Sequence, residues 1–248
     1  MKRIVIVLAL ILAVSLRAQA PQPVPLAQGG QPGEPHHHLK IENEYVRAYY
    51  VEVPPHESTQ LHQHDHDYLF VTLGDSDVMN AVLNKPEVRL VLKDGDVHFT
   101  RGGFAHVARN MADTPFRNVT IELLKPQQEA RNVCGPVISN VGFPICDPAK
   151  PERNGNLPLF ESSEVTLNLV ALGSKEKHSE SAIKLAFLVV GLGPDVKMHA
   201  KGNSPKTLRE GEIAWFDPGS DVQFSNESAK TVEFLELIFK DSAALAKP

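Results

Sequence analysis

The sequence predicts an all-β protein that contains two copies of one β-rich unit. Short apolar segments of strand-forming residues recur along the chain between Gly, Asp, Asn and Pro, whereas helical periodicity is nearly absent. Many short strands at this spacing are typical of a sandwich or a barrel. Residues 95–110 also resemble residues 211–226 at a constant offset of 116 positions. Such an internal repeat indicates that one β-rich unit occurs twice.

The first 20 residues have the pattern of a signal peptide. Lys2 and Arg3 precede an apolar run over residues 4–16, and residues 18–20 (Ala-Gln-Ala) form a small-x-small cleavage sequence. The apolar run is shorter than the about 20 residues of a comfortable membrane span, so we favour cleavage over an uncleaved anchor. We therefore expect an exported protein, periplasmic or secreted, with no membrane association after cleavage.

Net charge limits the partners of the mature chain. Removing residues 1–20 takes away three basic residues and leaves 22 basic and 30 acidic residues, a formal charge of −8. This charge argues against nucleic acid or an anionic membrane surface as the main partner. The remaining 228 residues are enough for one or two domains with a core. Whether they form a homodimer stays open.

The proline-rich stretch over residues 126–156 is interpreted as the linker between the two units, and it contains the only cysteines, Cys134 and Cys146. An exported protein meets an oxidising environment, so we expect these cysteines to form one disulfide. Two free thiols are the alternative.

The first unit is expected over residues 36–125, after a disordered arm rich in Pro, Gln and Gly at residues 21–35. It begins with three histidines, His36-His37-His38, which we interpret as a solvated tract. Its predicted strands span residues 45–53, 61–73, 78–83, 88–92, 97–100, 106–109 and 117–123.

The stretch over residues 61–73 carries the strongest functional signal. His62, His64, His66 and Tyr68 recur at every second position, so in one strand they would share a face. A row of imidazoles is costly to bury unless each ring has a partner, and one metal ion can be the partner of several neutral imidazoles. The alternative is a solvated edge strand.

The second unit is expected over residues 157–240, with strands at 165–172, 183–192, 212–216, 222–225 and 231–239. Residues 120–123 resemble residues 234–237 two residues out of the repeat register, and we place that shift in a loop. Val222 stands at the position of His106, while His178 and His199 are interpreted as surface residues. The second unit is therefore predicted to be metal-free.

His106 belongs to a second motif. The chain matches the pattern G-x5-P-x-G-x2-H-x3-N at Gly95, Gly103, His106 and Asn110, and replaces only the Pro, by Arg101. This pattern resembles the second motif of the cupin superfamily.

The first cupin motif, G-x5-H-x-H-x3,4-E-x6-G, is matched in part. His62 and His64 fit its two histidines. His56 stands at the leading Gly, Tyr68 stands at the Glu, and Gly74 comes one residue before the closing Gly. The resemblance covers residues 36–125 well and residues 157–240 weakly.

The resemblance implies two tandem jelly-roll barrels, a bicupin, with metal ligands at His62, His64 and His106. Fe(II) is favoured, while Mn, Ni, Cu or Zn would also suit such ligands. Cupins with three histidines and no Glu include iron dioxygenases, so the resemblance implies an enzyme of this class with a small organic substrate. A non-catalytic protein that binds metal or a small molecule, and a sugar isomerase-type cupin, are the alternatives.

Three more residues are candidates for the site. The phenol of Tyr68, with an ordinary pKa of about 10, would bond a ligand or water rather than the metal. His66 would supply a fourth nitrogen or support the ligands, or else be a core histidine. Arg101 would pair with a substrate carboxylate, or else be a surface cation near Asp94 or Asp96.

Overall fold

The computed structural model describes residues 31–138, 156–180 and 184–240. Within these residues the chain forms β-strands and one short 3-10 helix, Gln31–Gly33, with no α-helix. None of the helices in this part of the chain has the length and apolar character to span a membrane. The all-β prediction is confirmed. The expected signal peptide lies outside the described residues, so export stays a prediction.

The first barrel consists of two antiparallel sheets. The larger has the order β1 (His37–Glu42), β2 (Val46–Val53), β9 (Phe116–Leu123), β4 (Tyr68–Thr72) and β7 (Val97–Thr100). The smaller has the order β3 (His62–His64), β8 (Phe104–Asn110), β5 (Ser76–Val82) and β6 (Val88–Leu92).

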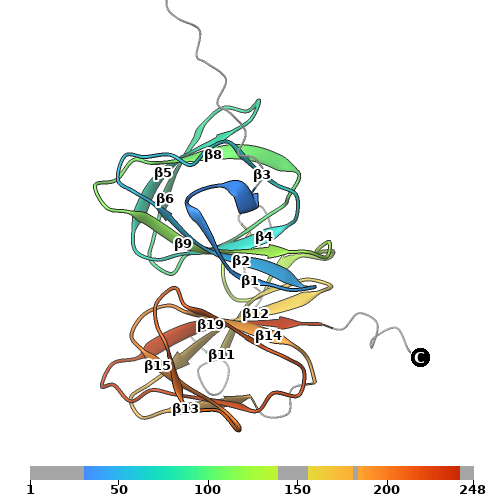
Figure 1. The fold of residues 1–248 in the computed structure, drawn as a ribbon, viewed down its shortest axis with the longest axis vertical. Helices are drawn as coiled ribbons and strands as arrows, with labels where there is room; N and C mark the ends of the chain where they lie inside the picture. The colour runs from blue at the N-terminus through green and yellow to red at the C-terminus, as the bar shows by residue number, and fades with distance from the viewer. Residues whose placement is uncertain (1–30, 139–155, 181–183, 241–248) are drawn as a thin grey trace, which may run out of the picture.

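The second barrel repeats this arrangement. Its larger sheet has the order β10 (Arg131–Asn132), β11 (Asn156–Glu161), β12 (Val165–Leu172), β19 (Val232–Phe239), β14 (Phe187–Gly191) and β17 (Ile213–Phe216). Its smaller sheet has the order β13 (Lys177–Glu180), β18 (Val222–Ser225), β15 (Val196–Ala200) and β16 (Lys206–Leu208). The two barrels lie one above the other (Figure 1).

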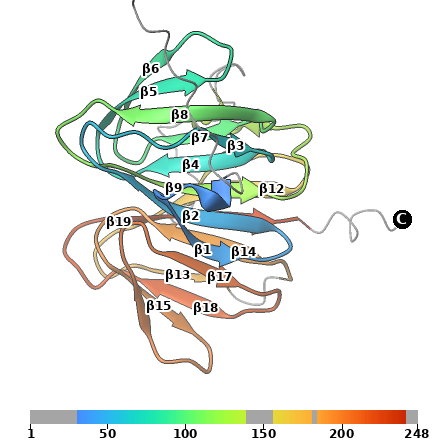
Figure 2. The same cartoon turned by 45° about the horizontal axis from the view of Figure 1, so that its top comes forward.

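The larger sheets of the two barrels pack face to face, as Figure 2 shows from a second direction. Strand β9 explains how: Val119, Ile121 and Leu123 join an apolar cluster that also contains Leu167 and Leu237 of the other barrel. The alternate residues of β9 point into the first barrel. Because both faces of these strands are covered, nearly every residue of β9 is buried.

A buried asparagine closes the same loop in each barrel. The Nδ2 atom of Asn110 lies 3.1 Å from the carbonyl oxygens of Val53 and Pro54 and 2.8 Å from that of Thr114. Asn226 makes the equivalent contacts with the carbonyls of Leu172, Gly173 and Lys230, at 2.9, 3.0 and 2.6 Å. The internal repeat therefore reproduces local hydrogen bonding as well as topology.

The repeat register differs from the prediction at its end. Val46 pairs with Leu123 and Val165 pairs with Phe239, so the offset of 116 positions continues through the last strand. Glu236 thus corresponds to Thr120, and the expected two-residue shift is wrong. The similar residue types in the two strands suggested a match that the backbone pairing does not follow.

The predicted single strand over residues 61–73 is also wrong: β3 and β4 belong to different sheets. The Asp67 carboxylate holds the bend between them, because it accepts hydrogen bonds from the backbone N–H groups of Gly102 and Gln127, each at 3.1 Å. A Cβ atom on Gly102 would lie 2.4 Å from the backbone of His66, so a glycine is needed at this crossing.

The segments assigned to the arm and the linker are partly folded. Glu34 is 2 % exposed, so the first barrel extends beyond its predicted start at residue 36. Strand β10 adds to the second barrel, and the Asn132 side chain holds the backbone of Ile138 at 2.7 and 2.8 Å. Cys134 is buried, but Cys146 lies outside the described residues, so the disulfide stays a prediction.

We predict that Asn226→Ala destabilises the protein by about 1–3 kcal/mol, because it leaves buried carbonyl groups without their donor. Urea unfolding measures this loss, and Asn203→Ala, at an exposed position of the same barrel, is the control. An Asn226→Ala protein as stable as the control would contradict the role of this contact.

We predict that stability depends on pH, because Glu122 is a buried carboxyl group with a raised pKa. Burial raises its pKa from 4.5 to about 7, Arg47 at 3.9 Å opposes the rise, and Asp65 adds to it. Between these two values the folded chain keeps a proton that the unfolded chain releases, so stability falls as pH rises. Relative to Glu122→Gln, the wild type should lose roughly 3 kcal/mol across this range.

The measurement is the free energy of unfolding at pH 4.5 and pH 7. Glu44→Gln, which changes an exposed carboxylate, should keep the wild-type dependence. Parallel pH profiles for the wild type and Glu122→Gln would show that this carboxyl group titrates normally.

Candidate metal centre

Three imidazoles converge inside the first barrel. The Nε2 atoms of His62, His64 and His106 form a triangle with sides of 3.1, 3.1 and 3.2 Å. Strand pairing produces this arrangement, because His62 lies directly opposite His106 in the β3–β8 ladder. His64 follows two residues later on the same face of β3.

Hydrogen bonds orient two of these rings. The Nδ1–H of His62 donates to the carbonyl oxygen of Gln60 at 2.9 Å, and the Nδ1–H of His106 donates to Oδ1 of Asn80 at 2.7 Å. Because each Nδ1 atom carries the proton, each Nε2 atom carries a lone pair that is available to a metal ion. This is how metal-ligating histidines are held in proteins.

Burial keeps the three rings neutral. It lowers the pKa of His62 to about 4 and that of His106 to about 3, and repulsion from neighbouring histidines adds to both shifts. The pKa of His64 lies well below its ordinary value for the same reasons. Neutral imidazoles are the form that binds a metal ion, so protons compete weakly at neutral pH.

The triangle fits a first-row metal ion. Bonds of about 2.0–2.1 Å at angles between 90° and the tetrahedral angle require nitrogens roughly 2.8–3.4 Å apart. The observed sides of 3.1–3.2 Å lie within that range. The donor set of neutral nitrogens suits Zn, Cu, Fe or Ni.

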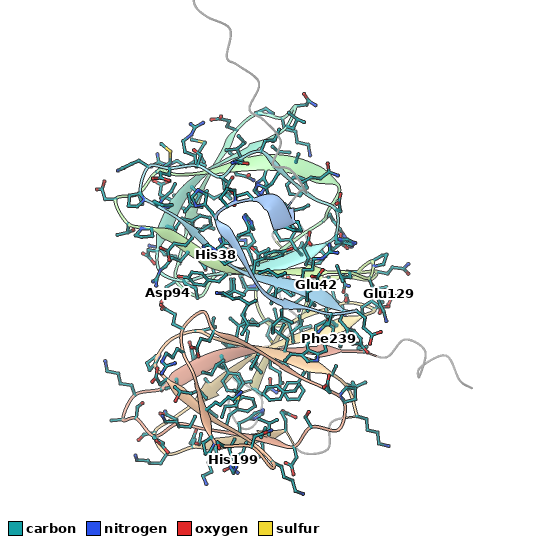
Figure 3. All side chains as sticks on the ribbon, in the orientation of Figure 1. His38, Glu42, Asp94, Glu129, His199 and Phe239 are labelled. Carbon is teal, nitrogen blue, oxygen red and sulfur yellow. The ribbon has the colours of Figure 1, made fainter. Side chains whose placement is uncertain are left out.

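A fourth histidine approaches the triangle from β1. A ring nitrogen of His37 lies within 4.8 Å of ring nitrogens of His62 and His64. Its side chain is 5 % exposed, so the expected solvation of the 36–38 tract is wrong for His37. His38 is exposed on the same strand, where Figure 3 labels it.

Glu34 orients His37. Its Oε2 accepts the Nδ1–H of His37 at 2.6 Å, and its Oε1 accepts the backbone N–H of Gln60 at 3.1 Å. Burial alone would raise the pKa of Glu34, but the hydrogen bond and charge of His37 hold it below its ordinary value. The sequence did not reveal this pair, because Glu34 and His37 lie in a polar, proline-containing stretch with no strand pattern.

Of the two candidate side chains Tyr68 and His66, only Tyr68 lines the described cavity. Tyr68 lines the cavity and stacks on His64, with ring centroids 4.2 Å apart. Burial raises the pKa of Tyr68 to about 12, although a hydrogen bond with Thr100 opposes the rise, so its phenol is neutral. His66 lies in the bend after β3 and is absent from the residues that line the described cavity.

Arg101 is held by neighbours other than those expected. Its guanidinium donates to Asp67 at 2.7 Å and to the carbonyl of Gln127, and it lies 5.0 Å from the ring of Phe99. Arg101 is thus a surface cation, as the alternative expected, but its ion-pair partner is Asp67 rather than Asp94 or Asp96. Arg101 still lines the cavity, but its charge is already compensated by Asp67.

The triangle opens into a cavity of about 540 Å³. Its wall is largely apolar, with Val51, Phe70, Leu90, Leu92 and Phe104 among its residues. His98 also lines it and stacks on Phe70 at 4.6 Å. Within the described part of the chain, no hydrogen-bond partner reaches its buried Nε2 atom.

Sequence reasoning missed His98, because it is a lone histidine in an otherwise ordinary strand.

The second barrel has a different interior. Val222 pairs with Glu180, as His106 pairs with His62 in the first barrel. His199 is exposed, as expected, and lies on the outside of the second barrel in Figure 3. The expectation that His178 is a surface residue is wrong: its side chain is 12 % exposed and bonds Glu180 at 2.7 Å.

No family model matches the sequence. No curated protein matches it either.

Solved structures do match the fold. AerE from Microcystis aeruginosa superposes with a TM-score of 0.57 at 10% identity, over 84% of this chain and 99% of that chain. Salicylate 1,2-dioxygenase from Pseudaminobacter salicylatoxidans gives 0.56 at 12% identity, over 81% and 75%. A variant of oxalate decarboxylase from Bacillus subtilis gives 0.54 at 11% identity, over 83% and 75%.

At these identities the likeness concerns the fold. Together with the repeated sheet order, it shows that the chain has the bicupin fold, two tandem cupin-type jelly-roll barrels.

Proposed function

We propose that the protein is an exported, metal-dependent dioxygenase that acts on a small organic substrate in its first barrel. The observation that carries this proposal is the triangle of Nε2 atoms, 3.1–3.2 Å apart, at the wall of a largely apolar cavity. Salicylate 1,2-dioxygenase, which shares the fold, supports the choice of reaction class.

His62, His64 and His106 would hold the ion, with Fe(II) favoured, and Glu34 would aim His37 at it. A bound redox-active metal supplies a Lewis acid and a binding place for O2. The protein supplies the rest: neutral ligands, a largely apolar cavity and fixed ring orientations. Tyr68 packs against His64 and so limits how far that ring can turn.

The wall of the cavity suggests the class of substrate. Phe70, Phe104 and the aliphatic side chains suit a flat apolar or aromatic body. The Nε2 atom of His98 offers one hydrogen bond to a polar substituent. Burial lowers the pKa of His98, so this ring is neutral. It would therefore orient a hydroxyl or carbonyl group without adding charge.

A non-catalytic binding protein is the second candidate, because the same wall would hold a ligand without turning it over. Neither Asp nor Glu is among the described residues that line the cavity. This weighs against the sugar isomerase-type alternative, whose proton transfers would need such a base.

Oxygen uptake by tag-free, Fe(II)-loaded protein on diketones, thiols and catechols separates the two. Turnover that His106→Ala abolishes supports the dioxygenase, whereas tight substrate binding without oxygen uptake supports the binding protein.

We expect His106→Ala to weaken metal binding by at least about 100-fold, because one of three converging nitrogens is lost. Tyr68→Phe should retain the metal, since its phenol bonds Thr100, and should change ligand binding or turnover. Elemental analysis after dialysis measures the metal content of both variants. His38→Ala, which removes an exposed histidine, is the control. Full metal content in His106→Ala would contradict the site.

We expect Glu34→Gln to weaken metal binding by about 10-fold, because His37 loses the carboxylate that orients it. Competition with a chromogenic chelator measures the affinity. Glu57→Gln, at an exposed position, is the matched control. Equal affinities in the two variants would show that His37 does not contribute to the site.

A further inference from the structure

A second cluster of ligand atoms lies in the second barrel. One atom each from His178, Glu180 and Glu236 lies within 4.8 Å of the other two. His178 and Glu180 come from β13, and Glu236 comes from β19 in the facing sheet. The Nε2 atom of His178 lies 2.7 Å from Oε1 of Glu180. The barrel therefore brings together residues that are more than fifty positions apart in the sequence.

Glu236 is the unusual member of this cluster. It is 0 % exposed, and its Oε2 accepts one hydrogen bond, from Nδ2 of Asn168 at 3.2 Å. Its Oε1 is buried and has no hydrogen-bond partner among the described residues. An incompletely satisfied buried carboxyl group is destabilising, so its retention calls for a compensating partner.

A cation would be such a partner. The buried Oε1 atom of Glu236 lacks a donor among the described residues, and a ligand atom of His178 and one of Glu180 lie close enough to share the same ion. The side chains of His178 and Glu180 are 12 % and 16 % exposed, which leaves a route from solvent.

We propose that the second barrel binds one divalent first-row metal ion through His178, Glu180 and Glu236. Two carboxylates and one imidazole compensate the charge of a divalent ion and suit Mn(II) or Zn(II). This proposal replaces the sequence-based expectation of a metal-free second barrel, and it does not depend on the proposed oxygenase activity.

The ligands do not repeat those of the first barrel. Only Glu180 has a counterpart there, since it faces Val222 as His62 faces His106. The rings of Phe224 and Phe234, both 0 % exposed, lie 6.2 and 6.1 Å from the ring of His178 and fill the space beside it. The ion therefore has a structural role: it joins the two sheets of the barrel.

The competing account is a metal-free carboxyl pair in which Glu236 keeps its proton and shares it with Glu180. The two accounts differ in the effect of Glu236→Gln, an almost isosteric change. In the metal site it removes a ligand charge. In the carboxyl pair it replaces one neutral hydrogen-bonding group by another and has no effect on bound metal.

The experiment titrates tag-free, metal-stripped protein with Mn(II) and follows free Mn(II) by electron paramagnetic resonance. We expect Glu236→Gln to bind one ion fewer per chain than the wild type, or to bind that ion at least ten-fold more weakly. Glu233→Gln, at an exposed position of the same strand, should match the wild type. Glu180→Gln is the second variant and is expected to lose the same ion. It tests the site if Glu236→Gln does not fold.

Unchanged Mn(II) binding in both Glu236→Gln and Glu180→Gln would overturn the proposal. So would a Glu236→Gln protein with a higher melting temperature and the full Mn(II) content, because that result identifies the carboxyl pair. An ion that is lost in His106→Ala and kept in Glu236→Gln belongs to the first barrel. Failure of the proposed function is therefore distinguishable from failure of the site in the second barrel.

Discussion

The register between β3 and β8 is the constraint on which the first barrel's site depends. It sets His62 opposite His106 and leaves His64 beside them, so three Nε2 atoms meet without any distortion of the strands. The backbone N–H of Gly103 donates to the carbonyl of His64 at 2.7 Å and continues this pairing. A one-residue slip of β3 would turn both His62 and His64 to the other side of the sheet, away from His106.

Asp67 secures that register from outside. Its carboxylate receives N–H groups from Gly102 and Gln127 and the guanidinium of Arg101, so it connects the bend after β3 to the turn before β8. The bend that positions the histidines is therefore held by charge and hydrogen bonds that do not involve the imidazoles. Burial keeps those imidazoles neutral.

The two barrels share one scaffold and use their interiors differently. Their larger sheets bury one face against each other, so that face must be apolar in both. The inner faces are free to diverge. In the second barrel Phe187 stacks on Phe216 at 4.7 Å and Phe224 stacks on Phe234 at 4.6 Å, and these rings occupy the interior. The first barrel carries the histidine triangle and the cavity beside it, which is why we assign the substrate to it.

The sequence by itself determined the all-β class and the repeat, and the resemblance to the two cupin motifs identified the three histidines of the triangle. These features are local: apolar alternation, glycine turns and short motif spacings depend on neighbours in the chain. The break at Asp67 was not visible, because an apolar run after alternating histidines has the pattern of one continuous strand. The repeat register at Glu236 was also missed, since residue types alone favoured Glu122 as its counterpart.

Only the tertiary structure decided which other side chains meet the triangle and the cavity. His37 arrives from β1, Glu34 from the segment just before it, and His98 from β7. In the second barrel, His178 and Glu236 come from the two different sheets. The physical reason is that barrel closure brings together strands that are distant in the sequence. Long-range strand pairing sets those contacts, and it leaves no spacing signal in the chain.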